Sequence, residues 1–313
     1  MDDRRGTFTL SLDVELAWGS WQRPHIPSTV FAQGAECALA VERISRECRF
    51  PFTWAVVSAL HDLTFEELGS VGDNESVAVL RPGLGPFNEP LPTVGMVRRN
   101  PDAWLAPRVV EALRNSPVEH DLGSHTYFHS TPSTAEGLIR DLEASRAALG
   151  GGLASLVYPR DRVAFEHTIP QAGLTNYRAP GTAWYFREGK ARGLGRVNHT
   201  LDQAIGRTAP GANVHGKDPV AISSSTILTL RTGIRRRIPY RVIRRRFVRP
   251  LRAAVSTGGL YHLYTHPWNL ALPSSDALML LEDICQEAKQ LVDAGDLRVR
   301  TMAALASDAE GTV

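Results

Sequence analysis

The chain has 313 residues, of which 43% are hydrophobic, and its formal net charge at pH 7 is +2. A chain of this length can bury a full core, either as one large α/β domain or as two smaller ones. The nearly balanced charge excludes a global electrostatic attraction to nucleic acid or to a membrane as the main determinant of its partners.

The three cysteines, Cys37, Cys48 and Cys285, are far apart in the sequence. Their odd number and wide spacing argue against a disulfide framework and against a cysteine-rich zinc site. The sequence runs from Met1 into a strand pattern without the apolar core of a signal peptide, and no apolar stretch is long enough to span a membrane. We therefore expect a soluble, cytoplasmic protein.

The first part of the chain predicts a strand, a helix and a second strand. Residues 7–13 alternate polar and apolar side chains, which is typical of a strand. Ser28 can cap a helix that runs to about Cys48. The nearly continuous apolar run over 52–58 is typical of a strand buried in a parallel sheet.

The same alternation of strand and helix continues along the chain. The patterns predict helices over 107–115, 134–149 and 275–294, and strands over 118–123, 153–158, 174–177, 259–265 and 297–300. Strands and helices at this spacing predict a parallel sheet or barrel with its chemistry at the carboxyl ends of the strands.

Two stretches interrupt this alternation within what we interpret as a single domain over 1–313. Residues of about 69–100 are rich in glycine and proline, which predicts a loop insertion over the site. An arginine-rich helical insertion is predicted at about 218–254, where Arg231–Arg252 contains ten arginines and no acidic residue. This stretch is either a solvated helix face paired with acidic neighbours or a patch for an anionic ligand or a membrane surface.

Two acidic residues and two histidines follow predicted strands. Asp13 and Glu15 are two apart at a strand end, so both carboxylates point to the same side. His125 and His129 directly follow the strand at 118–123, and one helical turn would bring their imidazoles onto one ion. A strand-end carboxylate would be a third ligand, with a position left for water, so we favour a metal site over ordinary loop histidines.

Two further motifs follow strands. Residues 177–181, Tyr-Arg-Ala-Pro-Gly, place Arg178 at a strand end, where it can hold a carboxylate through two hydrogen bonds. Residues 261–267 predict a strand with His266 at its mouth and His262 deeper on the same face. We interpret His262 as a core histidine and His266 as a catalytic one.

These motifs, in this order, resemble those of the polysaccharide deacetylases, the NodB-homology or family 4 carbohydrate esterases. Four ordered motifs match between about Thr7 and Pro267. The resemblance implies an α/β fold, a distorted (β/α) barrel with mostly parallel strands. It also implies one divalent metal ion, most often Zn²⁺, and the removal of acetyl groups from glycans.

Carried over by position, the family's roles fall on six residues: the general base Asp13, its orienting arginine Arg178, the general acid His266, and the metal ligands Glu15, His125 and His129. Substrate contacts are expected from Tyr177, Pro180, Trp184 and Trp18. Trp184 is the nearest candidate for the family's acetyl-pocket tryptophan.

The sequence departs from the family pattern at two positions. The usual first motif has adjacent aspartates, whereas Val14 separates Asp13 from Glu15 here, so either carboxylate remains a candidate for the acidic metal ligand. Tyr264 stands where the family has leucine. Family branches with Asp-x-Asp or Asp-x-Glu motifs act on other amides.

We therefore expect a metal-dependent hydrolase that deacetylates an N-acetylated sugar or polysaccharide precursor. The alternatives are a hydrolase of a small non-sugar amide and a non-catalytic glycan-binding relative. Four tryptophans, Trp18, Trp21, Trp104 and Trp268, are expected to be exposed and to stack on sugar faces. The arginine stretch suggests a phosphate- or lipid-linked glycan and peripheral contact with the inner face of a membrane, and no nucleic-acid partner is expected.

Overall fold

A computed structural model describes residues 5–22, 26–181, 211–228, 238–271 and 276–311. The strands in these ranges are β1 (Gly6–Val14), β2 (Thr53–Val56), β3 (Asp121–Ser124), β4 (Ser155–Val157), β5 (Asn176–Ala179), β6 (Val214–His215), β7 (Val220–Ser223), β8 (Thr226–Leu228), β9 (Leu260–Thr265) and β10 (Leu297–Val299). They form one sheet in the order β6-β7-β5-β4-β3-β2-β1-β9-β8, with β10 beside β1. Every pair in it is parallel except β6 with β7.

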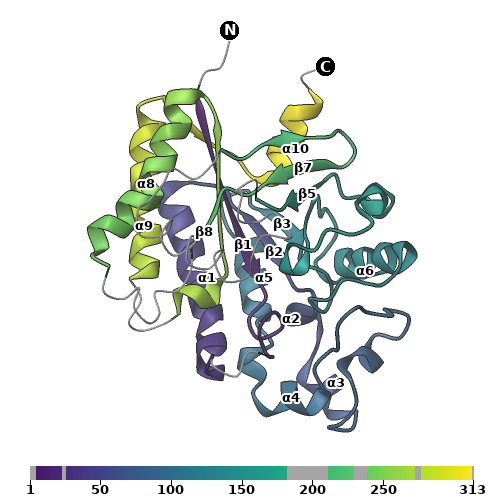
Figure 1. Ribbon diagram of the computed structural model, residues 1–313. Helices are drawn as coiled ribbons and strands as arrows, with labels where there is room; N and C mark the ends of the chain where they lie inside the picture. Colours follow the sequence, from purple (N-terminus) through teal and green to yellow (C-terminus); the bar gives the residue numbers. More distant parts are fainter. Residues whose placement is uncertain (1–4, 23–25, 182–210, 229–237, 272–275, 312–313) are drawn as a thin grey trace, which may run out of the picture.

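Helices cover the outside of this sheet. The α-helices are α1 (Ser28–Cys48), α2 (Ala59–Asp62), α3 (Phe65–Gly69), α4 (Val94–Arg99), α5 (Pro107–Arg114), α6 (Ala135–Ala148), α8 (Tyr240–Thr257), α9 (Ala277–Asp293) and α10 (Met302–Glu310). Short 3₁₀ helices cover Val77–Leu80, Pro101–Ala103, Pro159–Asp161, Glu166–Ala172 and Pro267–Leu270. Figure 1 shows α1, α8 and α9 along one side of the sheet and α6 on the other. This is the distorted (β/α) barrel that the sequence predicts.

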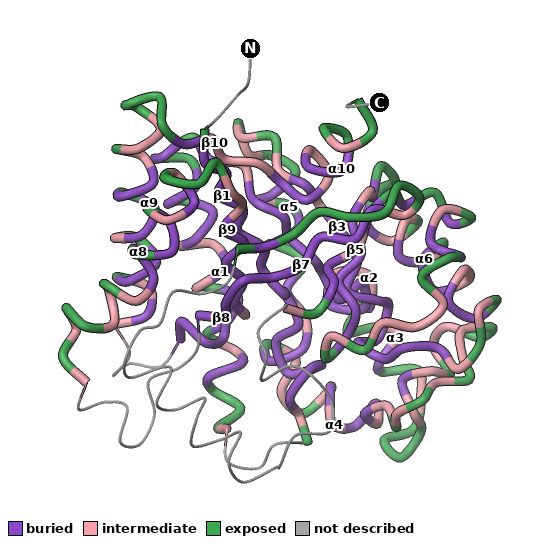
Figure 2. Tube along the Cα trace, turned by 45° about the horizontal axis from the view of Figure 1, so that its top comes forward, coloured by how far each residue is buried: buried purple, intermediate pink, exposed green. Residues whose placement is uncertain are grey.

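The alternation of residues 7–13 corresponds to the two faces of strand β1. Its apolar residues Phe8, Leu10 and Leu12 are fully buried on one face, against the helices. The polar face is buried as well, and Ser11 Oγ lies 2.9 Å from His262 Nε2 inside the sheet's curve. Figure 2 shows most of the strands in the colour of buried residues, and successive residues of β1 and β2 are all buried, which is typical of a parallel sheet covered by helices.

The segment at about 218–254 is not only helical. It begins with β7 and β8, which pair with β5 and β9, and its helix α8 starts at Tyr240. The prediction missed these strands because three or four residues are too few to show a periodicity of two. No helix among the described residues is long and apolar enough to cross a membrane.

Candidate metal centre

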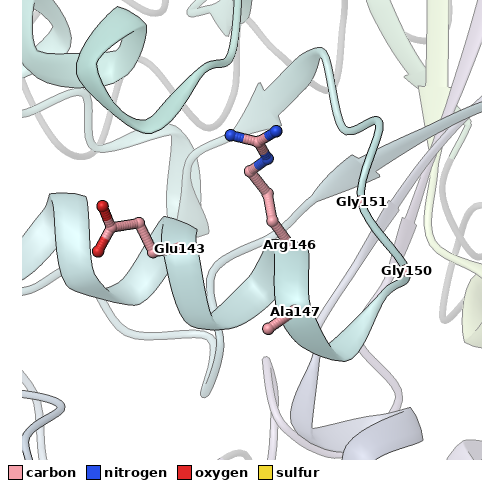
Figure 3. Close-up of a pocket in the computed structure, with 5 residues that line it drawn as sticks. All are labelled: Glu143, Arg146, Ala147, Gly150 and Gly151. Atoms are coloured by element: carbon pink, nitrogen blue, oxygen red, sulfur yellow. The ribbon is translucent and has the colours of Figure 1, made fainter.

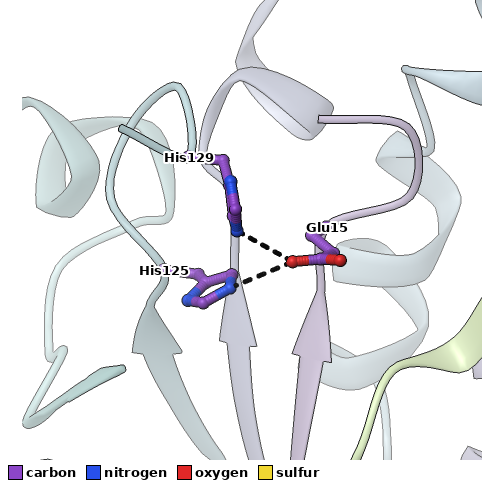
Figure 4. A group of neighbouring side chains, drawn as sticks. All are labelled: Glu15, His125 and His129. Carbon is purple, nitrogen blue, oxygen red and sulfur yellow. Dashed lines mark hydrogen bonds and ion pairs between the residues drawn. The ribbon is translucent and has the colours of Figure 1, made fainter. Parts of the chain in front are cut away.

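Glu15 and His125 lie at the ends of the two strands that flank β2. Glu15 follows the last residue of β1, and His125 follows the last residue of β3. Both strands pair in parallel with β2, so their carboxyl ends reach the same edge of the sheet. Figure 4 shows the two side chains above these strand tips with His129 beside them.

The three side chains form a compact, buried cluster. Glu15 Oε2 lies 2.8 Å from His129 Nε2 and 3.4 Å from His125 Nε2, and each side chain is at most 4% exposed. Their potential ligand atoms all lie within 4.8 Å of one another. In tetrahedral zinc sites, ligand atoms at roughly 2.0–2.2 Å from the ion are roughly 3.3 Å apart, so these spacings suit such an ion.

The second ring nitrogen of His125 agrees with a metal site. His125 Nδ1 lies 2.8 Å from the carbonyl oxygen of Val157, so Nδ1–H donates there and the lone pair of Nε2 faces the cluster. His129 Nδ1 is buried and has no hydrogen-bond partner among the described residues. The three residues therefore fit a divalent ion with mixed nitrogen and oxygen ligands.

The charges in the cluster favour cation binding at two of its three residues, Glu15 and His129. Burial by itself would raise the pKa of Glu15, but His266 and His129 hold it well below its ordinary value. Burial lowers the pKa of His129, which favours the neutral imidazole that a metal requires. For His125, burial acts in the same direction, but the hydrogen bond with Glu15 and the charge of Asp13 raise its pKa overall.

The two histidines are close for a different reason than the sequence suggested. They lie on a loop rather than on a helical turn, and Thr126 and His129 adopt left-handed backbone conformations with φ of 61° and 55°. The loop is fixed where Asp141 Oδ1 accepts a hydrogen bond of 2.9 Å from the N–H of Tyr127. The prediction of a helical turn is wrong, although the imidazole rings are 4.8 Å apart between centroids.

Asp141 gives the site region a pH-dependent stability. Burial raises the pKa of Asp141 to about 8 from 3.8, and the Tyr127 N–H offsets only part of this. Because the folded protein keeps this proton up to about pH 8 while the unfolded chain loses it near 3.8, stability falls as pH rises between these values.

We expect Asp141→Asn to become more stable than the unchanged protein as pH rises from 5 to 8. Asparagine retains an acceptor for the N–H of Tyr127 and has no proton to lose. The difference in free energy of unfolding between the variant and the unchanged protein should therefore grow by about 1.4 kcal/mol for each pH unit between the two pKa values of Asp141. Urea unfolding at several pH values measures it. A gap that stays constant over this range would contradict the assignment.

Asp13 is engaged by arginine rather than by the histidines. Arg178 Nη1 and Nη2 donate to its two oxygens at 2.6 and 2.7 Å, and Arg178 Nη2 also lies 3.1 Å from Asp161 Oδ1. Burial would raise the pKa of Asp13, but the Arg178 guanidinium and the nearby histidines hold it below its ordinary value. Of the two candidate carboxylates, Glu15 thus lies nearer the nitrogens of His125 and His129, and Asp13 is a buried, ionised carboxylate paired with Arg178.

Tyr264 contributes a second contact to Arg178. The guanidinium carbon lies 4.2 Å from the centroid of the Tyr264 ring, within the range of a cation–π interaction. Leucine, which the resemblance would place here, has no such ring. Tyr264 therefore helps to hold Arg178, whose guanidinium pairs with Asp13.

His266 lies at the mouth of the cluster. Its Nε2 is 3.6 Å from Asp13 Oδ2 and 3.7 Å from Glu15 Oε1, and its side chain is 18% exposed. Its Nδ1 is 3.2 Å from Asn269 Nδ2. His262, in contrast, is fully buried between Ser11 and Ser223, and burial lowers its pKa to about 3, so it is a core histidine as predicted.

Two of the predicted substrate contacts, Tyr177 and Pro180, lie on β5 or just after it. Tyr177 lies on the face of β5 opposite Arg178, since successive residues alternate, and its ring packs on Tyr158. Pro180 is exposed at the end of β5. Trp184 lies outside the described residues.

The prediction of exposed tryptophans is wrong for three of the four, and the fourth, Trp21, is partly buried against the core. Trp18, Trp104 and Trp268 are 2–5% exposed. Trp18 donates from Nε1 to the Trp104 carbonyl, and their rings pack edge to face. Large aromatic surface is stabilising when it is buried, and sequence alone does not show on which side of the chain the core lies.

Three residues near the cluster were not predicted. Trp268 Nε1 donates to Glu15 Oε1 at 3.0 Å, Asp161 contacts Arg178, and Gly19 lies against Glu15. Two sequence positions could have pointed to these residues. Trp268 directly follows His266-Pro267, and Gly19 stands four residues after Glu15. Neither pattern has a specific meaning without the fold.

The segment over 69–100 reaches the histidine loop through Glu89. This carboxylate accepts hydrogen bonds from Ser130 Oγ at 3.0 Å and Arg162 Nη1 at 2.6 Å, and it pairs with Arg160 at 3.0 Å. Glu89 thereby joins three loops at the carboxyl ends of the strands.

A surface hollow lies apart from the metal cluster, at the end of α6 (Figure 3). It shares no residue with the cluster and is lined by Glu143, Arg146, Ala147, Gly150 and Gly151.

No family model and no curated protein matches this sequence. Solved structures match its fold, among them proteins assigned as polysaccharide deacetylases from Mycobacterium smegmatis (TM-score 0.60, 12% identity) and Pseudomonas aeruginosa (TM-score 0.56, 10% identity). The Puue allantoinase matches with a TM-score of 0.55 and 10% identity. Each match covers 99% of this chain and 92% of the other. The chain thus shares the fold of the polysaccharide deacetylases.

Proposed function

We propose that this protein is a metal-dependent hydrolase that removes the acetyl group from an N-acetylated sugar or polysaccharide precursor, with Zn²⁺ held by Glu15, His125 and His129. The observation that carries the proposal is the meeting of this cluster with the Asp13–Arg178 pair and His266. His266 Nε2 lies 3.6 Å from Asp13 and 3.7 Å from Glu15, so it connects the Asp13–Arg178 pair with the cluster at the strand ends, where barrel enzymes place their chemistry. The fold shared with polysaccharide deacetylases supports it.

Each residue has a part in amide hydrolysis. When bound, the ion would polarise the acetyl carbonyl and lower the pKa of a water molecule. Asp13, kept ionised by Arg178, is placed to accept the proton of that water. His266, at the exposed mouth, is placed to donate a proton to the departing amine, which is a poor leaving group without it.

Acetate release from N-acetylated chitooligosaccharides by the zinc-loaded protein tests the proposed substrate class. Release from these sugars and none from simple amides supports it. Hydrolysis of simple amides without acetate release from any sugar would replace it with the second candidate.

That second candidate is hydrolysis of a small non-sugar amide by the same residues. Burial of Trp18, Trp104 and Trp268 removes three of the four aromatic surfaces expected to stack on sugar rings. An allantoinase is among the proteins that share this fold. A small substrate would need only the groups around His266 and the metal ligands.

We propose that the arginine-rich helix α8 contacts an anionic membrane surface that presents a lipid-linked substrate. Arg244 and Arg252 pair with Asp283 and Glu287 of α9. Three other arginines of α8 are exposed and form no ion pair with any described residue. They recur at intervals of four residues and so form a stripe along one side of the helix: Arg241, Arg245 and Arg249. Each arginine near an anionic surface contributes about 1 kcal/mol, so this stripe supports weak peripheral binding.

Replacing Arg241, Arg245 and Arg249 by alanine should weaken binding to phosphatidylserine vesicles by about 100-fold, which corresponds to about 3 kcal/mol. Vesicle sedimentation at low and physiological salt measures this. Alanine at the exposed Arg43, Arg108 and Arg114 removes equal charge from α1 and α5 and should change little. Equal losses in both triple variants, or no binding by the unchanged protein, would end this part of the proposal.

A further inference from the structure

Trp268 and Gly19 both lie against the carboxylate of Glu15. Trp268 Nε1 donates to Oε1 at 3.0 Å, while Oε2 faces His129 Nε2 at 2.8 Å. Trp268 and Glu15 are 5% and 3% exposed, so water does not compete for these contacts. The two oxygens of this carboxylate therefore have different partners.

Gly19 leaves the space in which the carboxylate lies. A Cβ atom at Gly19 would be 2.1 Å from Glu15 Cδ and Oε2 and 2.3 Å from Oε1, closer than atoms can approach. The chain turns back here, since the N–H of Trp18 bonds to the carbonyl of Glu15 at 2.9 Å. Because the clash falls on the end of a flexible side chain, a substitution would move the carboxylate more readily than it would unfold the protein.

Trp268 is itself held in place by its neighbours. Its ring packs edge to face on Phe31, with centroids 5.7 Å apart, and it lies 5.4 Å from the ring of His266. The indole N–H therefore has a fixed position in the core. A glutamate side chain has one more rotatable bond than aspartate, and a fixed donor on one oxygen restricts that freedom.

We propose that Trp268 and Gly19 are positioning residues that fix the Glu15 carboxylate so that Oε2 alone is presented to the metal ion. The inference rests on the proposed metal site and explains how a glutamate serves there. Removing a hydrogen bond that orients a metal ligand commonly weakens metal binding 10- to 100-fold. Displacing the ligand itself has a larger effect.

Zinc affinity measured by competition with a chromophoric chelator tests this inference without any substrate. Trp268→Phe should bind zinc about 10- to 100-fold more weakly, and Gly19→Ala more weakly still. Trp54→Phe is the matched control, because Trp54 is fully buried and its Nε1 has no hydrogen-bond partner among the described residues. Gly72→Ala is the second control, since the nearest atom to a Cβ there is 3.8 Å away. Both controls should keep the affinity of the unchanged protein.

The same measurement in a Glu15→Ala background separates positioning from general destabilisation. There, Trp268→Phe and Gly19→Ala should cause no further loss, because both act through the Glu15 side chain. The Co²⁺ absorption spectrum should also change in Gly19→Ala. Unchanged zinc affinity in both single variants, or equal losses with and without Glu15, overturns the inference. Failure of the unchanged protein to bind zinc instead overturns the proposed function on which it rests.

Discussion

Chelation of the bound metal should abolish acetate release by this protein, and added Zn²⁺ should restore it. A metal ion contributes several kcal/mol to hydrolysis by polarising the carbonyl and activating water, so a loss on the order of 1,000-fold or more is expected. His125→Ala should show the same loss and resist rescue by zinc. The reason is that His125, which contacts both Val157 and Glu15, would be one of the three ligands of the ion.

The control for this prediction is an exposed histidine far from the cluster in sequence. His215 lies on the exposed strand β6, and His215→Ala should keep both zinc binding and activity. Metal content of the purified variants is measured alongside acetate release. Undiminished activity in excess EDTA would show that the cluster is not a catalytic metal site.

Asp13→Asn should lower kcat by about 100- to 10,000-fold while zinc affinity stays near that of the unchanged protein. Asparagine has almost the shape of aspartate and can still accept one hydrogen bond from Arg178, but it cannot accept a proton from water. Zinc binding should persist because Glu15, rather than Asp13, lies beside His125 and His129. A split of this kind distinguishes a general base from a metal ligand.

Asp161→Asn is the comparison that makes this result specific. Asp161 contacts the same guanidinium, at 3.1 Å, but among the described residues it forms no ion pair with His266, as Asp13 does. We expect only a modest loss of kcat, since Asp13 retains both hydrogen bonds from Arg178. Equal losses in the two variants would mean that both act only by holding the arginine. A loss of zinc affinity in Asp13→Asn would instead make Asp13 a ligand.

Much of the scaffold is visible in local sequence patterns. Alternation along residues 7–13 and the apolar run at 52–58 predict β1 and β2, and both pair in a parallel sheet as expected. The sequence also places Asp13, Glu15 and His125 at strand ends. Parallel strands bring their carboxyl ends to one edge, so these residues were expected to meet.

Other features depend on packing between distant segments. The hydrogen bond from Trp268 to Glu15 joins residues 253 positions apart. The burial of Trp18 depends on Trp104 and Phe128, which arrive from other parts of the chain. The short strands β7 and β8 depend on their neighbours β5 and β9 rather than on any period of their own.

By itself, the sequence determined the alternation of strands and helices and the donor groups available at the strand ends, because hydrophobic period and residue chemistry are local properties. The tertiary structure alone decided how those groups are divided. It turned Asp13 toward Arg178 and Glu15 toward the histidines, and it bent residues 125–129 into a loop in place of a helical turn. Such choices depend on sheet register and side-chain packing, which involve residues that no short pattern contains.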